Sequence, residues 1–340
     1  MHTEVRAEVV PPGPYRLPRA SADGLLRQRG GVLFRFVRRD GHDVLLRAAQ
    51  LRDGRVVVGA AVARSDAAAT ADPRTALAAA LGDWRHALGC DVDLRPFVAA
   101  HRRDPLIGAS LRTRPWLRPA RRLSVFESVL AAITEQLIAY EDAVVIQRRV
   151  IARHGTALPA LRPSHPRLRE TPDAATVAAR LIPAHFEACG LAPSRAVSLH
   201  RAAREIASGR IEVGPRADAD RVLARLERIP GIGTWTLALV ATQALGRFDR
   251  APSGDLNLVK ALGRLRTGDP RARVEEHEVD AWLARYAPWG ALAAAHIMAT
   301  RPETLRDPTQ PSPTAGTAPI AARRPTTPAA RVPIPVGIPA

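Results

Sequence analysis

Two glycines within residues 226–260 have the spacing that suits contact with a phosphate oxygen, and an aspartate follows them at the start of the next predicted helix. Gly231 and Gly233 lie just ahead of a predicted helix that starts at Thr234. Glycines allow a tight turn with positive φ and let a bulky partner come close. A helix that begins beyond them exposes its first N–H groups and its positive dipole end to a phosphate oxygen. Asp255 lies at the start of the next predicted helix, where its position alone favours an N-cap role.

Two predicted helices hold the glycine turn in place. Ahead of the turn, apolar residues recur with the period of one helical face, and Pro230 ends that helix. Beyond the turn, residues 234–245 are apolar nearly all round, which predicts a buried helix that stops at Gly246. The sequence therefore predicts a helix-hairpin-helix unit at 218–245. The apolar residues of its first helix are Val222, Leu223, Leu226 and Ile229.

Four blocks, taken in order along the chain, resemble the helix-hairpin-helix DNA glycosylases, and among these the DNA-3-methyladenine glycosylase II group most. They are FESVLAAITEQL at 126–137, LxxIPGIGxWT at 226–236, DxxLxK at 255–260 and YAPWGALAAAHI at 286–297. The resemblance covers roughly residues 90–305. A PGIG turn by itself also occurs in purely DNA-binding modules, so the ordered set carries the resemblance.

The resemblance implies that Asp255 is the catalytic residue at the mouth of a base pocket. A carboxylate there stabilises the positive charge that develops on the sugar, and it orients or deprotonates the attacking water. N-capping and catalysis are compatible, because one oxygen can cap the helix while the other faces the substrate. The rival acids are Asp249, expected to be a loop residue, and Glu135, expected to face solvent or to be structural.

The same resemblance places Trp235, Trp289 and Leu239 in the base pocket. Two indole faces would hold a cationic, alkylated base by stacking and cation–π attraction of about 0.5–2 kcal/mol each. The competing interpretation for Trp235 is core packing. Leu239 and Gly290 stand where the family has a tyrosine and an arginine, and Met298 stands where an aromatic residue is common. These departures put the range of substrates in doubt rather than the type of reaction.

The pair Gln136-Leu137 matches the family's pair at a turn between helices, where the apolar residue fills the gap left by a flipped base. Leu137 is also in phase with the apolar face of its own helix, so core packing is the alternative. The residues expected to bind DNA are Gly231, Gly233, Thr234, Gln136 and Leu137.

Trp235 occupies the position where glycosylases that also cut the strand carry a lysine nucleophile. Lys260 is the only lysine of the chain and lies at the basic position of DxxLxK, so hydrolysis by water is expected. The favoured function is a monofunctional DNA glycosylase for alkylated bases of the 3-methyladenine type in base excision repair. The alternative is a non-catalytic helix-hairpin-helix DNA-binding protein, and a bifunctional glycosylase/lyase for oxidised bases lacks the lysine and cysteines it needs.

The charge and the cysteine content limit which binding partners and which cell compartment are expected. The 340 residues carry 50 Lys and Arg against 33 acids, and the net charge of +17 favours a polyanionic partner over a mere aid to solubility. Two cysteines provide neither a disulfide framework nor a metal cluster. Without a signal-like or membrane-spanning apolar run, we expect a cytoplasmic, nucleoid-associated monomer bound to double-stranded DNA with a damaged base. No cofactor or metal is expected, and a monovalent cation at the hairpin is left open.

The fold class is predicted as α+β, mostly α, in three parts. Residues 1–90 hold β-rich runs separated by Asp-Gly turns and followed by one helix, which predicts a small antiparallel sheet domain. Residues 91–305 form an all-helical glycosylase region. Residues 306–340, rich in Pro and Ala, are expected to be a disordered tail.

Overall fold

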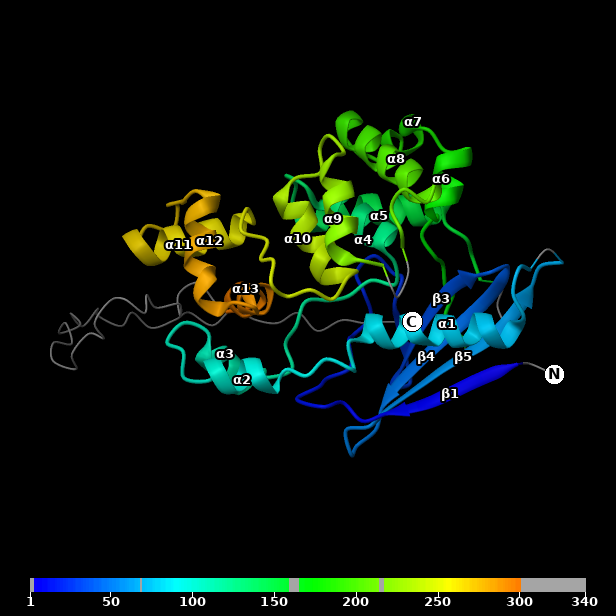
Figure 1. Cartoon of the computed structure of the whole chain (residues 1–340), viewed down its shortest axis with the longest axis horizontal. Helices are drawn as coiled ribbons and strands as arrows, with labels where there is room; N and C mark the ends of the chain where they lie inside the picture. Colours follow the sequence, from blue (N-terminus) through cyan, green and yellow to red (C-terminus); the bar gives the residue numbers. More distant parts are fainter. Residues whose placement is uncertain (1–2, 68, 159–164, 214–216, 301–340) are drawn as a thin grey trace, which may run out of the picture.

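The computed structural model describes residues 3–67, 69–158, 165–213 and 217–300, and the predicted tail at 306–340 lies outside them (Figure 1). One antiparallel sheet forms near the N-terminus, and the regular elements in the rest of the described chain are helices joined by loops. The fold is therefore α+β and mostly helical, as the sequence predicted. No helix in these ranges is long and apolar enough to cross a membrane.

The sheet has five strands in the order β1-β5-β4-β3-β2. The Asp-Gly turns correctly predicted its three central strands, which pair as a meander. The two outer strands were missed: β1 lies far from β5 in the sequence, and β2 is only three residues long. The strands are β1 Glu4–Val9, β2 Arg27–Arg29, β3 Val32–Arg39, β4 His42–Gln50 and β5 Val56–Ser65.

Helix α1, Pro73–Leu88, lies across the sheet (Figure 1). Asp72 caps it by accepting hydrogen bonds from two backbone N–H groups of the first turn, and Gly89 ends it in the left-handed conformation with φ 61°. The apolar face of the helix is buried against the sheet, as its spacing predicted. The residues of this face are Leu77, Leu81, Trp84 and Leu88.

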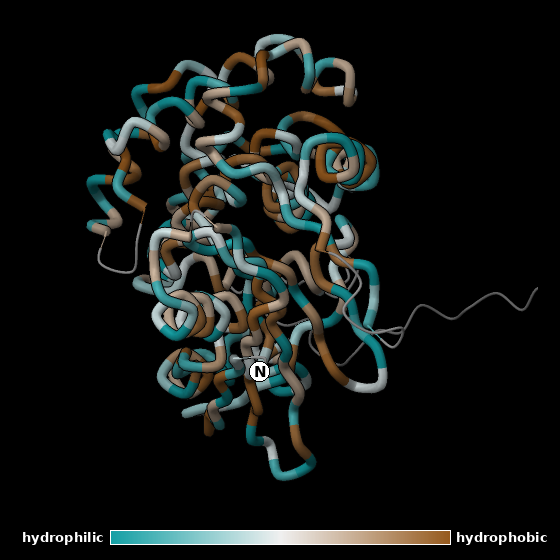
Figure 2. Tube along the Cα trace, turned by 90° about the vertical axis from the view of Figure 1, so that its right-hand side faces the viewer, coloured by the Kyte–Doolittle hydropathy of each residue, from teal (hydrophilic) through white to brown (hydrophobic). Residues whose placement is uncertain are grey.

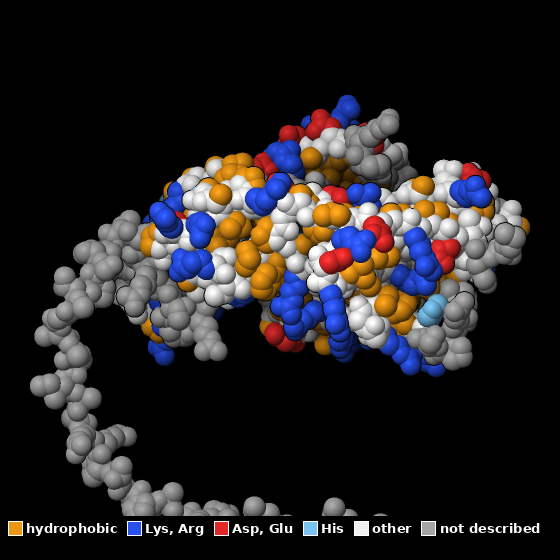
Figure 3. Space-filling model, turned by 90° about the horizontal axis from the view of Figure 1, so that it is seen from below, with side chains coloured by type: hydrophobic (Ala, Val, Ile, Leu, Met, Phe, Trp, Pro, Cys, Tyr) orange, Lys and Arg blue, Asp and Glu red, His pale blue; other side chains and the backbone are white. Residues whose placement is uncertain are grey.

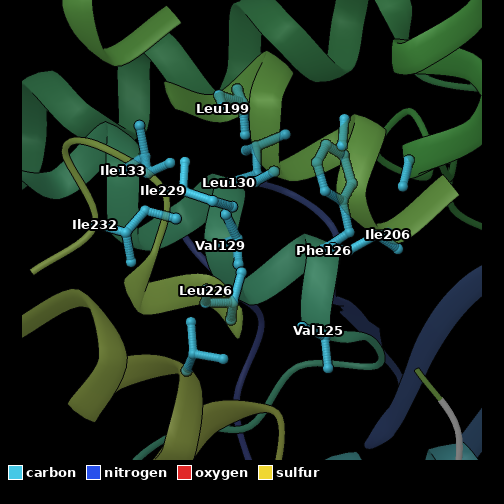
Figure 4. Close-up of a cluster of buried hydrophobic side chains, with 14 of the residues drawn as sticks. Val125, Phe126, Val129, Leu130, Ile133, Leu199, Ile206, Leu226, Ile229 and Ile232 are labelled. Atoms are coloured by element: carbon cyan, nitrogen blue, oxygen red, sulfur yellow. The ribbon is translucent and has the colours of Figure 1, made fainter. Parts of the chain in front are cut away.

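Seven helices pack around one apolar core, and we call them the first helical body. Figure 4 shows this core, in which α4 supplies a row of side chains that meets residues of α8, α9 and the hairpin. Arg35 of β3 joins the sheet to α4 through a buried ion pair with Glu127 at 2.7 Å. The helices are α4 Val125–Glu135, α5 Tyr140–His154, α6 Ala174–Arg180, α7 Pro183–Glu187, α8 Pro193–Ala207, α9 Ala219–Glu227 and α10 Thr234–Gln243.

A second helical body has its own core and is assembled from two separate segments of the chain. Two short helices that precede the first body lie beside helices that follow it, as Figure 1 shows. Figure 2 shows hydrophobic and hydrophilic stretches alternating along the trace of the helices. The helices are α2 Arg95–His101, α3 Gly108–Thr113, α11 Leu256–Thr267, α12 Glu276–Leu283, the 3-10 helix η1 Ala284–Tyr286 and α13 Gly290–Met298.

Candidate active site

The hairpin between α9 and α10 needs glycine at one of its two glycine positions. Gly231 has φ 89°, and a Cβ placed on it would lie 2.4 Å from Ser198 Oγ. That hydroxyl donates a 2.7 Å hydrogen bond to the carbonyl of Pro230, so it cannot easily move away. Gly233 differs from the prediction, because its φ is −104° and a Cβ there would meet open space. Only Gly231 therefore makes the tight turn, and the space beside Gly233 is open to a partner.

The N-terminus of α10 has no side-chain cap, since Gly233 occupies the N-cap position. This leaves first-turn N–H groups without a capping oxygen from Gly233, as a phosphate site requires. Thr234, which was predicted to bind DNA, donates through Oγ1 to Glu276 Oε1 of α12 at 2.7 Å. Its hydroxyl thus joins the two helical bodies and brings a carboxylate beside the predicted phosphate site.

Asp255 caps α11 and at the same time faces the first helical body. Its Oδ1 accepts a 2.8 Å hydrogen bond from the backbone N–H of Asn257. Its Oδ2 lies 3.4 Å from Nε1 of Trp235, whose indole N–H points at it. Both side chains are half-buried. The structure therefore brings together two of the predicted site residues, one from each body, and the N-cap role of Asp255 is confirmed.

Trp289 and Leu239 lie in different surroundings. Trp289 is half-buried, and its ring centroid lies 6.0 Å from those of Phe97 and His101, both on α2. It packs on the core of the second helical body. Leu239 is half-buried on α10, one turn beyond Trp235. Phe97 and His101 escaped the sequence analysis because nothing in their local pattern links them to a tryptophan so far along the chain.

Of the two residues that follow α4, Gln136 is bonded to the hairpin and Leu137 is exposed to solvent. Gln136 Nε2 donates to the carbonyl of Gly231 and to Oγ1 of Thr236, both at 2.9 Å, which fastens the end of α4 to the hairpin. Leu137 has φ 55° and a side chain that is 95% exposed. The core-packing interpretation of Leu137 is therefore wrong. A leucine held at positive φ in water costs about 1–3 kcal/mol, and such an exposed apolar group suits insertion into another molecule.

The two rival acids behave differently. Asp249 forms an ion pair with Arg247 at 2.7 Å and lies in a loop, as expected. Glu135 is half-buried and accepts a 3.1 Å hydrogen bond from Gln147 Nε2, so it does not simply face solvent. Burial raises the pKa of its carboxyl group above the ordinary value. The periodicity of α4 does not indicate that the Glu135 side chain is half-buried.

Arginine side chains are spread over the surface seen from below in Figure 3, with acidic side chains among them. Several of the arginines elsewhere in the described chain are committed to ion pairs, as Arg122 is to Asp23 at 2.6 Å. On this face the positive side chains lie in several separate places rather than in one dense cluster. No group of three or more His, Cys, Asp or Glu side chains in the described ranges is placed to hold a metal ion.

The hairpin, the capping aspartate and the exposed leucine lie on a fold that solved DNA glycosylases share. The structure is similar to the 3-methyladenine DNA glycosylase from Archaeoglobus fulgidus, with a TM-score of 0.66 and 19% identity over 86% of this chain and 96% of that one. It is also similar to the 8-oxoguanine glycosylase/lyase from Clostridium acetobutylicum, with a TM-score of 0.58 and 13% identity over 80% and 96% of the two chains. The resemblance predicted from the sequence is confirmed at the level of the fold.

Comparison of sequences agrees with this fold. A curated relative from Mycobacterium tuberculosis, described as a probable bifunctional transcriptional activator/DNA repair enzyme AlkA, is 26% identical over 219 residues. The match covers 64% of this chain and 41% of the relative, so the chain matches less than half the length of that protein. No family model matches the chain.

Proposed function

We propose that the chain is a monofunctional DNA glycosylase that hydrolyses the N-glycosidic bond of alkylated bases of the 3-methyladenine type. The observation that carries the proposal is the pairing of Asp255 with Trp235 across the two helical bodies, 3.4 Å apart. A carboxylate fixed as a helix cap at the N–H edge of an indole offers negative charge beside an aromatic ring. This is the combination that a cationic base and a developing sugar cation both require.

The proposed reaction assigns a role to each of the exposed or half-buried side chains at the site. Leu137 enters the base stack of the duplex and occupies the space of the extruded base, since an unfilled gap costs a few kcal/mol. The base leaves with the bonding electron pair, and Asp255 stabilises the oxocarbenium-like sugar. Water then adds to the anomeric carbon and gives its proton to Asp255 or to solvent. A base that is already cationic leaves as a neutral molecule, so it needs no acid.

Hydrolysis by water rather than by an amine is part of the proposal. The position that holds a lysine in strand-cutting relatives of this fold holds Trp235, and Lys260 is the only lysine of the chain. The product is then an abasic site in an intact strand. Nicking should appear only after treatment with alkali, and borohydride should trap no protein–DNA adduct. A prompt nick or a strong adduct would contradict the monofunctional mechanism.

The decisive experiment measures base release from duplexes that each carry one lesion, with Asp255→Asn as the test variant. Asparagine caps helices as well as aspartate does, so α11 should stay folded. Removing the charge should slow release at least about 100-fold and leave duplex binding intact. The matched control is Asp249→Asn, a nearby acid that pairs with Arg247. Duplex binding without base release by the wild-type chain would favour the non-catalytic DNA-binding alternative.

A further inference from the structure

A pocket of about 260 Å³ lies between the sheet domain and the chain that leads into α4. Three segments form its wall: residues 16–19 between β1 and β2, the end of α1, and residues 116–121 ahead of α4. Four arginines and no acidic residue line this space, and we call it the arginine pocket. The arginines are Arg16, Arg19, Arg118 and Arg121. Such a wall offers positive charge from several chain segments to one ligand.

The arginine pocket is separate from the candidate active site. Arg121 Nη2 donates to the carbonyl of Gly246, which follows α10, at 3.3 Å. Trp235 stands at the opposite end of α10, and this helix is about 15 Å long. A ligand in the arginine pocket and a base beside Trp235 therefore occupy different places.

The two half-buried arginines of the pocket lack an anionic partner. Arg118 donates to the carbonyls of Leu88 at 2.7 Å and Trp116 at 3.1 Å. Arg121 donates to the carbonyl of His86 at 3.4 Å, and its buried Nε has no hydrogen-bond partner. None of the four arginines forms an ion pair with a carboxylate of the described chain. A guanidinium group that leaves water without a counter-anion is unfavourable, so these side chains suit an anion from outside the chain.

The charges around the pocket favour an anion there. Burial, followed by the neighbouring positive charge of Arg118, lowers the pKa of Arg121 to about 10. Burial also lowers the pKa of Arg118. The charge of Asp91 raises the pKa of Arg121, yet the Asp91 carboxylate is already paired with Arg85 at 2.8 Å. A bound anion would offset the repulsion between the two guanidinium groups.

The rest of the wall is apolar and includes one aromatic ring. The indole of Trp116 is half-buried, and the guanidinium carbon of Arg16 lies 5.5 Å from its ring centroid. Leucine, proline and alanine side chains complete the wall. The volume corresponds to roughly nine water molecules of about 30 Å³ each, which is more than a phosphate ion alone would fill. A ligand that fits therefore joins an anionic group to a flat, largely apolar body.

We propose that the arginine pocket binds a nucleoside monophosphate. The phosphate pairs with the guanidinium groups, whose planar fork of donors matches phosphate oxygens. The base lies against the indole of Trp116, since any nucleobase can stack on an aromatic ring. The bound nucleotide bridges three chain segments at the junction of the sheet domain and the first helical body. The inference does not rest on the proposed glycosylase activity, because no residue of the candidate active site takes part.

Titration with adenosine monophosphate, followed by tryptophan fluorescence, tests the proposal. The nucleotide should quench the fluorescence of the wild-type chain, and Trp116→Phe should remove most of the quenching. The double variant Arg16→Ala/Arg19→Ala changes only exposed side chains, so it should stay folded. It should bind the nucleotide at least about 10-fold more weakly, because charge-assisted hydrogen bonds to the phosphate are lost. Arg52→Ala, an exposed arginine in the turn between β4 and β5, is the matched control and should bind as the wild type does.

Adenosine and inorganic phosphate separate the two parts of the ligand. Each should bind at least about 5-fold more weakly than the whole nucleotide. The nucleotide should also raise the melting temperature of the wild type and the control, but not that of the double variant. Phosphate binding as tight as nucleotide binding, unchanged affinity in the double variant, or no saturable binding would each overturn the proposal. Base release from damaged duplexes is a separate measurement, so its failure would leave this result standing.

Discussion

The two helical bodies present apolar side chains to the site in opposite ways. In the first body, Leu137 is 95% exposed and sits at positive φ directly after a helix. In the second, Trp289 rests against Phe97 and His101 and is half-buried. The apolar surface of Leu137 is exposed to solvent, whereas the Trp289 ring packs against a core. The first body thus leaves a large apolar side chain exposed beside the site, whereas the second packs its tryptophan on its own core.

This difference teaches where the chain tolerates strain. The hairpin region gains rigidity from its neighbours, because Gln136 bonds to Gly231 and Ser198 bonds to Pro230. Such support allows an unfavourable backbone conformation at Leu137 to persist. Asp255 carries no such strain and follows the ordinary geometry of an N-cap, with φ −66° and ψ 127°.

Acid should weaken the second helical body most. His296 is fully buried there, and desolvation lowers its pKa from 6.5 to about 4. Between pH 6.5 and about pH 4, His296 is protonated in the unfolded chain but neutral in the folded chain. The contribution of this group to the free energy of unfolding is therefore complete above pH 6.5 and is lost as the pH falls to about 4. The loss amounts to about 3 kcal/mol. Urea unfolding measured across this range checks it, and His296→Asn should flatten the dependence; an unchanged slope in that variant would assign the loss to other groups.

Removal of the packed ring should cost stability, and removal of the exposed leucine should not. Trp289→Ala should lower the free energy of unfolding by about 2 kcal/mol, less than the loss of a fully buried ring, because the Trp289 ring is only partly buried. Leu137→Ala should leave the free energy of unfolding nearly unchanged. Urea titrations of both variants under one buffer test the contrast directly. A similar loss of unfolding free energy in both variants would contradict the contrast between a packed Trp289 and an exposed Leu137.

The exposed leucine should matter only when a base stack has to be opened. Leu137→Ala should slow release of a damaged base from duplex DNA by roughly 10-fold, because the variant fills less of the gap left by unstacking. Release from a single strand with the same lesion should not change. An equal effect on both substrates would mean that Leu137 contacts the flipped base itself.

The smallest effect concerns the backbone of the same residue. Leu137→Asn should raise the free energy of unfolding by about 0.5 kcal/mol, because asparagine tolerates the left-handed conformation better than leucine does. The variant should still lose activity on duplex DNA, since its short polar side chain cannot act as a wedge. Thermal unfolding checks the first part, and a destabilised variant would show that Leu137 makes contacts in the folded chain.

The sequence was informative where a local pattern determines the structure. The cap at Asp255, the turn at Gly231 and the meander β3–β4–β5 each follow from a few adjacent residues, and all three are as predicted. The positive φ expected at Gly233 is wrong, because a glycine that begins a helix needs no left-handed conformation. Capping and turn chemistry operate within a few residues, so such features can be found without a structure.

Features that depend on distant residues could not be predicted. The phase of Leu137 matches the apolar face of α4, yet the helix ends two residues earlier, and the leucine turns outward. The surroundings of Glu135 come from Asp23 and Arg122, which belong to other parts of the chain. The roles of the predicted base-pocket and DNA-binding residues stay predictions, and the experiments above address them.

The division of the second helical body between two segments sets an order for synthesis of the protein. Helices α2 and α3 leave the ribosome well before α11 to α13, with the whole first body between them. Chains fold largely from the N-terminus as they emerge, so Phe97 and its neighbours wait with their apolar surfaces uncovered until the last helices arrive. The first body can close around its core earlier. A nascent chain therefore completes the hairpin between α9 and α10 before it contains Asp255.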